Sequence, residues 1–424
     1  MLATIRDRYL LALQYQDYRT LWTANTFSGA ASWALIIARG WLAYEVTEEM
    51  FWVGLVTLAA MIPRLFATPL FGFLADRFDR QSLLRSVYTL EFAHNVVLAL
   101  LVMQGVVQGP GGLWVLLVLS LVNGTMRSGQ MTITQSLVPN LVPKEYLLNA
   151  IALNQATQQG SRMVGALAII PLLAVLGPNG LVAAFWLCSG FYLIGLIQVS
   201  RIKTRSTGVI DPARSFFRNL IAGFEYVYGR PQILAMVLLV LAHCALTMSY
   251  ESILPGISVD KLGAGSVGMS YLIGAVGAGA LTTSIFLAGV KNARTRGIFF
   301  LVFGITSGLG PILMALSSSR ELSILAAAAM GANQAGFMTI SHTIIQSLVD
   351  DNVRGRVSGV YSVHVGGSMA VTNFINAYFA DLFSASAVMA VGGALFIIVI
   401  TISVGSGVLR RIYFPKLAPT PVTA

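Results

Sequence analysis

Charged side chains are scarce in this chain. Asp, Glu, Lys and Arg make up 10% of its 424 residues, against 56% for the hydrophobic types. Soluble domains carry roughly 25% charged residues, so a soluble protein with an ordinary solvated surface is excluded. The composition is that of a polytopic membrane protein. At roughly 20 residues for each helical span, the length accommodates about twelve spans and leaves no room for a large soluble domain.

Cysteines and catalytic signatures are also nearly absent. The two cysteines, Cys188 and Cys244, lie inside apolar runs, so neither a disulfide framework nor a cysteine-based metal site is predicted. The sequence has no glycine-rich phosphate loop ending in Lys-Ser/Thr and no HExxH motif. We therefore expect no enzyme, no cofactor, no metal and no ATP drive. The first twenty residues lack a small-residue cleavage site, which predicts a retained amphipathic segment rather than a signal peptide.

What the sequence has in abundance is apolar runs long enough to cross a bilayer. Backbone polar groups in hydrocarbon must be bonded within their own segment, so each run is predicted to be a helix. We expect an all-α membrane protein of twelve transmembrane helices in two six-helix pseudo-symmetric halves. The predicted spans are residues 20–43, 51–75, 83–104, 113–137, 147–176, 180–200, 231–257, 265–290, 297–317, 322–346, 357–382 and 386–409.

The basic residues predict the topology. The chain has 27 Lys and Arg and a net charge of +10. Most of them lie at the termini and in alternate gaps between spans, whereas the opposite gaps hold only Lys261 and Arg320. Cytoplasmic loops are enriched in Lys and Arg, so both termini are predicted to be cytoplasmic in a bacterial inner membrane. Because the cations punctuate apolar runs and form no basic face, nucleic acid is not an expected partner.

A polar break divides the chain. Residues 201–230 contain six cations, which predicts an N-terminal half (1–200), a cytoplasmic linker (201–230) and a C-terminal half (231–424). The middle of the linker is either an amphipathic helix on the membrane surface or a mobile tether. Gln-Ser-Leu-Val occurs at 135–138 and again at 346–349, 211 residues apart. This offset is close to half the chain and favours two homologous halves.

The loop after the second predicted span resembles the signature loop of the major facilitator superfamily. The matching residues, at the expected spacing, are Gly72, Leu74, Ala75, Asp76, Arg77, Asp79 and Arg80. Residues 141–143, 149–154, 250–255 and 354–357 resemble the bacterial branch of enterobactin-exporter-like and macrolide efflux proteins.

The resemblance implies the major facilitator fold and efflux of an amphiphilic organic molecule that is siderophore-, drug- or macrolide-like. Alternating access and proton antiport are expected with it, although the fifth span reads RMVGA at 162–166 where the antiporter signature carries a Gly-Pro pair, so uniport stays open. A lipid or lysolipid flippase, an importer, and a non-transporting sensor or scaffold are the alternatives. The expected partners are a small-molecule substrate, protons and membrane lipids, with the chain as a monomer.

The signature loop is interpreted as a conformational latch. Gly72 lets another helix approach closely, and Asp76 is expected to accept hydrogen bonds at the N-terminus of the helix that begins near Val357. Arg77 and Arg80, with Asp79 between them, are expected to bind acids or helix C-termini of the other half. These contacts would hold an outward-open state. The alternative is that the charges only enforce topology.

Ionisable side chains inside the spans are the candidates for proton coupling, since each costs on the order of 3 kcal/mol at the bilayer centre unless it is paired or hydrated. Glu91 is predicted to pair with Arg127 or Arg64 in one aqueous cavity. It is either the proton-responsive group or half of a permanent ion pair.

The seventh span holds two more ionisable groups. His243 and Glu251 are eight residues apart, so we expect them on a similar helix face. His243 is either a titrating group or a satisfied core histidine, and Glu251 is expected at an external gate. Arg162 matches an arginine common in the resembled branch, and the resemblance implies a packing or gating role for it. Arg39 is expected to reach the interface.

Polar and aromatic residues at depth predict a roomy amphipathic cavity, or, taken singly, hydrogen bonds between helices. These candidate substrate-cavity residues are Asn25, Trp33, Asn123, Gln130, Gln155, Gln158, Asn333, Gln334, Phe337, Tyr361 and Asn373.

Overall fold

The computed structural model describes residues 10–108, 110–207, 216–287, 292–350 and 353–414. All regular structure in these residues is helical, which confirms the predicted all-α class. The first half contains α2 (Gln16–Thr47), α3 (Met50–Met61), α4 (Arg64–Arg77), α5 (Arg80–Met103), α6 (Pro110–Leu141), α7 (Leu147–Val175) and α8 (Gly180–Ser200). The linker contains α9 (Phe216–Tyr228). The second half contains α10 (Pro231–His243), α11 (Leu254–Ile257), α12 (Gly265–Leu287), α13 (Ala293–Leu316), α14 (Arg320–Leu348), α15 (Arg354–Leu382), α16 (Ala385–Gly405) and α17 (Gly407–Tyr413).

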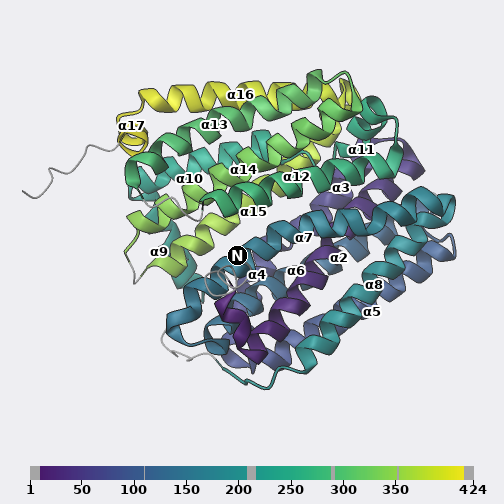
Figure 1. Ribbon diagram of the computed structural model, residues 1–424, viewed down its shortest axis with the longest axis horizontal. Helices are drawn as coiled ribbons and strands as arrows, with labels where there is room; N and C mark the ends of the chain where they lie inside the picture. Colours follow the sequence, from purple (N-terminus) through teal and green to yellow (C-terminus); the bar gives the residue numbers. More distant parts are fainter. Residues whose placement is uncertain (1–9, 109, 208–215, 288–291, 351–352, 415–424) are drawn as a thin grey trace, which may run out of the picture.

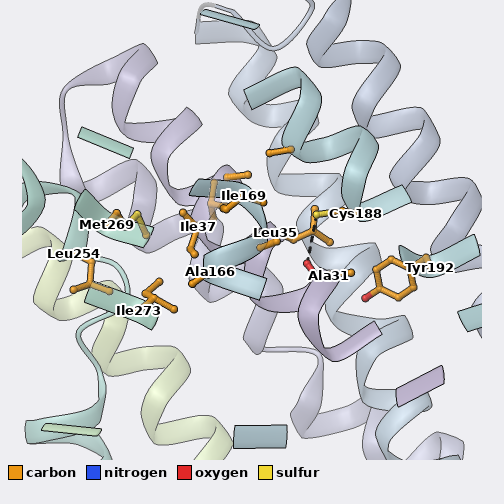
Figure 2. Packing of buried hydrophobic residues seen from close by; sticks show 14 of the residues in the cluster. Ala31, Leu35, Ile37, Ala166, Ile169, Cys188, Tyr192, Leu254, Met269 and Ile273 are labelled. Carbon is orange, nitrogen blue, oxygen red and sulfur yellow. Dashed lines mark hydrogen bonds between the residues drawn. The ribbon is translucent and has the colours of Figure 1, made fainter. Parts of the chain in front are cut away.

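The helices gather in two bundles. Figure 1 shows α2 to α8, coloured purple to blue-teal, on one side of the molecule and α10 to α16, teal to yellow, on the other. The bundles meet where α7 packs on α12 and α3 packs on α15. In Figure 2, Ile37 and Ala166 of the first bundle lie close to Met269 and Ile273 of the second, so this part of the junction is apolar.

Seven helical stretches among the described residues are long and apolar enough to cross a bilayer. They are Met50–Arg77, Arg80–Met103, Gly180–Ser200, Pro231–Met248, Gly265–Leu287, Arg294–Leu316 and Ala385–Gly405. The other five predicted spans fall on α2, α6, α7, α14 and α15, which have 29 to 32 residues. Helices of this length are about 44–48 Å long. Polar side chains lower their mean hydropathy, and three of the five line the cavity described below.

The seventh predicted span is broken, which corrects the sequence prediction. Regular α-helix ends at His243, π-helix continues from Cys244 to Met248, and after a break at 249–253 α-helix resumes at Leu254. Side chains of α15 satisfy the freed backbone groups: Asn376 Nδ2 donates to Ser249 O at 2.6 Å, and Asn373 Oδ1 accepts from Ser252 N at 3.2 Å. Such partners make a break tolerable at membrane depth. His243 and Glu251 therefore do not share a face of one helix.

The two ends of the molecule differ in charge. One end, here called the acidic end, carries six carboxylates among its described residues but only the cations Lys261 and Arg320. The carboxylates are Glu45, Glu48, Glu49, Asp260, Glu321 and Asp381. The opposite end, the basic end, holds the loop between α4 and α5, the start of the linker and α9. This arrangement follows the alternation of cations that the sequence predicted.

The described part of the linker has no regular helix from 201 to 207 and forms a helix from Phe216 to Tyr228, where the amphipathic interpretation expected one. Tyr226 Oη and Arg230 Nη2 donate to Asp350 Oδ2 at 2.9 and 3.2 Å, so α9 is attached to the second bundle. The start of the linker is attached to the first bundle, because Asp17 Oδ2 accepts from Thr204 N at 2.8 Å.

Candidate functional site

A small polar cavity of about 30 Å³ lies in the first bundle between α2, α6 and α7. Three predicted cavity residues, Asn25, Gln130 and Gln158, line it together with Arg127. The other lining residues were not predicted, because their small or polar side chains are common in membrane helices. These are Ser28, Gly29, Met131, Thr134, Asn154, Thr157 and Ser161.

Hydrogen bonds fix the orientation of the polar wall. Arg127 Nη1 donates to Gln130 Oε1 at 2.9 Å. The other end of that amide, Gln130 Nε2, donates to Ser28 Oγ at 2.6 Å and Tyr88 Oη at 2.7 Å. Tyr88 in turn donates to Asn25 Oδ1 at 3.3 Å. The Arg127 guanidinium is therefore held at the cavity by a neutral partner, and α2, α5 and α6 are joined behind it.

Glu91 lies behind this wall and not in the predicted ion pair. Its Oε2 accepts from Asn123 Nδ2 at 2.8 Å, and its side chain is buried. Among the described residues no ion pair joins Glu91 to Arg127 or Arg64, because Arg127 is held by Gln130. Arg127 and Arg39 attract the carboxylate over a longer distance. Arg39 is itself buried, with Nε donating to Leu35 O at 3.3 Å, so it does not reach the interface as predicted.

Arg162 and Glu251 meet at the junction of the bundles. Arg162 Nη2 donates to Tyr250 Oη at 2.9 Å and lies 4.0 Å from Glu251 Oε1. The guanidinium also lies 4.4 Å from the ring centre of Trp33. Both charged side chains are buried, at 8% and 4% exposure. The sequence analysis singled out both residues but did not pair them, because they belong to different halves. It missed the role of Tyr250, which also donates to Gln334 Oε1 at 3.3 Å.

The acidic end is closed by a second contact between the bundles. The Asp381 carboxylate on α15 accepts from the backbone N–H groups of Met50 and Phe51, each at 2.7 Å. A carboxylate at a helix N-terminus is stabilised by the unpaired N–H groups and the helix dipole. One turn later, a Cβ at Gly54 would lie 2.5 Å from Ala377 Cβ, so only glycine permits this spacing of α3 and α15. Asp381 was not among the predicted site residues.

The predicted latch does not reach the second bundle in this structure. Asp76 is exposed and pairs with Arg80, 3.4 Å away on the next turn, instead of the helix that begins near Val357. Arg77 is exposed. A Cβ added at Gly72 would lie 3.9 Å from Thr132 Cγ2, which belongs to the same bundle.

Asp79 and Arg80 instead attach the loop to its own half and to the linker. Asp79 accepts from Ser82 N at 2.8 Å and Ser206 N at 3.0 Å, while Arg80 Nη1 donates to Asn140 Oδ1 at 3.0 Å. Burial raises the pKa of Asp79, but the hydrogen bonds from Ser82 and Ser206 and the nearby Arg205 outweigh burial and hold the pKa below its usual range.

His243 and Phe337 lie in the core of the second bundle, outside the cavity. His243 is fully buried, with Nε2 2.7 Å from Ser307 Oγ and its ring stacked on Phe337 at 4.2 Å. His243 thus lies in the core, as one of the two predicted alternatives has it, with Nε2 bonded and Nδ1 without a hydrogen-bond partner among the described residues.

The remaining candidates join helices or lie away from the cavity wall. Asn333 accepts from Thr306 Oγ1 at 2.9 Å, and Asn373 holds Ser252. Tyr361 is buried, and Gln155 is exposed outside the cavity lining.

Comparison with known proteins identifies the family. Residues 10–411 match the family described as transmembrane secretion effectors. The chain is 24% identical over 310 residues to the uncharacterised MFS-type transporter YvqJ of Bacillus subtilis, covering 72% of this chain and 71% of that protein. It is 21% identical over 373 residues to macrolide efflux protein A of Streptococcus pyogenes, covering 86% and 89% of the two chains.

The fold resembles the crystal structure of the nucleoside transporter NupG. The TM-score is 0.71 at 10% identity, over 94% of this chain and 100% of that one. Together with the signature loop and the helical bundles, these matches assign the chain to a family of multi-pass membrane transporters, not enzymes. The protein belongs to the transmembrane secretion effectors of the major facilitator superfamily.

Proposed function

We propose that this protein is a secondary transporter of a bacterial inner membrane that exports an amphiphilic organic molecule in exchange for protons. Twelve spans form two halves, residues 1–200 and 231–424, whose relative movement gives alternating access to the cavity in the first half, with the basic end in the cytoplasm. The observation that carries the proposal is the polar cavity beside Arg127. The cavity lies near the junction of the two bundles, and the bonds across that junction lie near the middle of α7 or at the acidic end. The efflux functions named for macrolide efflux protein A and for a multidrug efflux pump, Tap, of Mycolicibacterium fortuitum support the direction.

The bonds between the halves favour access from the basic end. Hydrogen bonds and ion pairs between residues of the first and second halves, in the described part of the chain, run from Arg162 to Tyr250 and Glu251, and from Asp381 to Met50 and Phe51. They lie near the middle of α7 or at the acidic end. In this interpretation Arg162 and Glu251 form the external gate, and an unengaged Asp76 is expected because the latch closes only when the gate opens.

Proton coupling is assigned to Glu91. It is one of two carboxylates well inside the predicted spans, and the other, Glu251, is held by Arg162. The Asn123 hydrogen bond keeps Glu91 in place. Glu91 lies behind the cavity wall, and Arg127 attracts its carboxylate. A substrate bound at Arg127 would therefore change the free-energy cost of ionising Glu91.

Purified protein in liposomes that contain a pH-sensitive dye tests the function. A panel of macrolides, hydroxamate siderophores and fluorescent amphiphiles is applied with and without an imposed proton gradient. Antiport predicts that at least one substrate moves protons in the opposite direction and accumulates against its own gradient. Transport that ignores the proton gradient contradicts antiport, and redistribution of labelled lipid without any organic substrate indicates a flippase instead.

The latch makes a separate prediction. Asp76→Asn is expected to leave insertion and folding unchanged but to slow transport severalfold, because the closed basic end loses a charged hydrogen-bond acceptor. The measurement is initial efflux rate per inserted protein. Glu225→Gln, an exposed change on α9, is the control. Unchanged turnover of the Asp76 variant would leave these charges with a topological role alone.

A further inference from the structure

The interior of the spans carries more positive than negative charge. Four arginines, Arg39, Arg64, Arg127 and Arg162, lie within predicted spans, against the two acids Glu91 and Glu251. Glu251 is taken by Arg162, and Glu91 is buried behind the cavity against Asn123. No residue that lines the cavity is acidic, and Arg127 is its one charged lining residue.

From this imbalance we infer that the cavity selects an anionic amphiphile and that Arg127 binds its acidic group, a carboxylate, phosphate or sulfonate. The inference rests on the proposed function, because it names the substrate class of the same site. Arg127 is half-buried, and its guanidinium is bonded to the neutral Gln130 amide. A guanidinium has five N–H donors, and carboxylates and phosphates match its planar fork with two parallel bonds.

A second arginine adds to the attraction for an anion. Arg64, at the start of α4, lies near enough to Arg127 for the two charges to repel. Among the described residues Arg64 makes no ion pair, although Glu251 attracts it over a longer distance. An anion at Arg127 relieves this repulsion. A lipophilic amine finds no carboxylate on the cavity wall and meets the same positive charge, so the site is built against it.

The rest of the wall suits the oxygen-rich neighbourhood of an acidic group. Amides and hydroxyls from α2 and α7 surround the cavity, and some are already ordered: Asn25 Nδ2 donates to Asn154 Oδ1 at 3.4 Å, and Trp22 Nε1 donates to Thr157 Oγ1 at 2.6 Å. Met131 supplies adaptable apolar surface. The cavity therefore offers a cation, neutral donors and acceptors, and a small apolar contact.

Two probes that differ only in charge test this inference. Dansylated 11-aminoundecanoic acid ends in a carboxylate, and mono-dansylated 1,11-diaminoundecane ends in an ammonium. Equilibrium binding of each probe to the purified protein in neutral detergent is followed by dansyl fluorescence. We expect the carboxylate probe to bind at least tenfold more tightly. Arg127→Gln should weaken the carboxylate probe about tenfold or more and leave the ammonium probe no weaker, while Arg127→Lys retains part of the affinity.

The controls separate charge recognition from folding and from transport. Arg85→Gln removes the same charge from an exposed position and should change neither affinity. Gln130→Glu, which places an acid beside Arg127, should reduce or reverse the preference if Arg127→Gln does not fold. The inference is overturned if the ammonium probe binds as tightly as the carboxylate probe or more tightly, or if the carboxylate probe shows no saturable binding. It is also overturned if the affinity for the carboxylate probe is unchanged in both Arg127→Gln and Gln130→Glu. Because binding needs no gradient, carboxylate selectivity without proton flux would contradict antiport alone.

Discussion

Glu91→Gln is expected to abolish proton-driven accumulation of substrate while leaving substrate exchange intact. Glutamine has the shape of the neutral carboxyl group, and its Oε1 can keep the hydrogen bond that Asn123 Nδ2 donates at 2.8 Å. The variant therefore keeps the cavity wall but cannot release or bind a proton. Accumulation driven by a pH gradient should fall at least tenfold in proteoliposomes. Exchange of labelled for unlabelled substrate across the same membrane, which needs no net proton movement, should remain within about twofold of the wild type.

Exchange is the control that makes this result specific. Loss of both accumulation and exchange would indicate that Glu91 holds the bundle together, as the permanent structural role predicts. Accumulation that persists in the variant would remove Glu91 from proton coupling altogether. Glu225→Gln, a change of the same kind on the exposed surface of α9, should affect neither measurement.

The second large effect is expected at the gate. Glu251→Gln leaves the Arg162 guanidinium buried without its ion partner, and breaking a buried pair in this way costs about 3–5 kcal/mol. The cost is smaller once the halves separate and water reaches Arg162. The variant is therefore expected to favour the state that is open at the acidic end by at least tenfold, with transport slowed because closure becomes the difficult step.

Thiol labelling measures this shift directly. The two native cysteines are buried, so a single Met269→Cys reporter in the apolar seam has little background. A water-soluble maleimide should label the reporter faster when Glu251→Gln is present. Glu321→Gln, an exposed carboxylate at the same end, should leave the labelling rate unchanged. The double variant Arg162→Gln, Glu251→Gln should change the labelling rate of the reporter by less than the sum of the two single effects. Equal labelling in Glu251→Gln and wild type would contradict the gate.

Patterns local to one helix were predictable from the sequence. Apolar runs located the helices because hydrocarbon forces local backbone bonding, and the spaced residues from Gly72 to Arg80 identified the superfamily. Burial of charge at Glu91 and Arg162 also followed from their positions in apolar runs, since the depth of a residue depends only on its distance from the helix ends.

Pairing between helices was not predictable in the same way. Arg162 and Glu251 lie in different halves, and nothing local to either residue indicates that Tyr250 joins them. Glu91 was paired with the wrong partner because the sequence cannot show that the Gln130 amide holds Arg127. The break after His243 was missed because the residues that stabilise it, Asn373 and Asn376, come from α15.

The attachments of the linker set a mechanical limit on transport. Ser206 is fastened to Asp79 in the first half, and α9, which begins at Phe216, is fastened through Tyr226 to Asp350 in the second. The ten residue steps from Ser206 to Phe216 reach at most about 33–36 Å when fully extended. As long as both attachments hold, Ser206 and Phe216 at the basic end cannot move further apart than the length of the chain that joins them. Chain length therefore places an upper limit on the separation of these two points at the basic end.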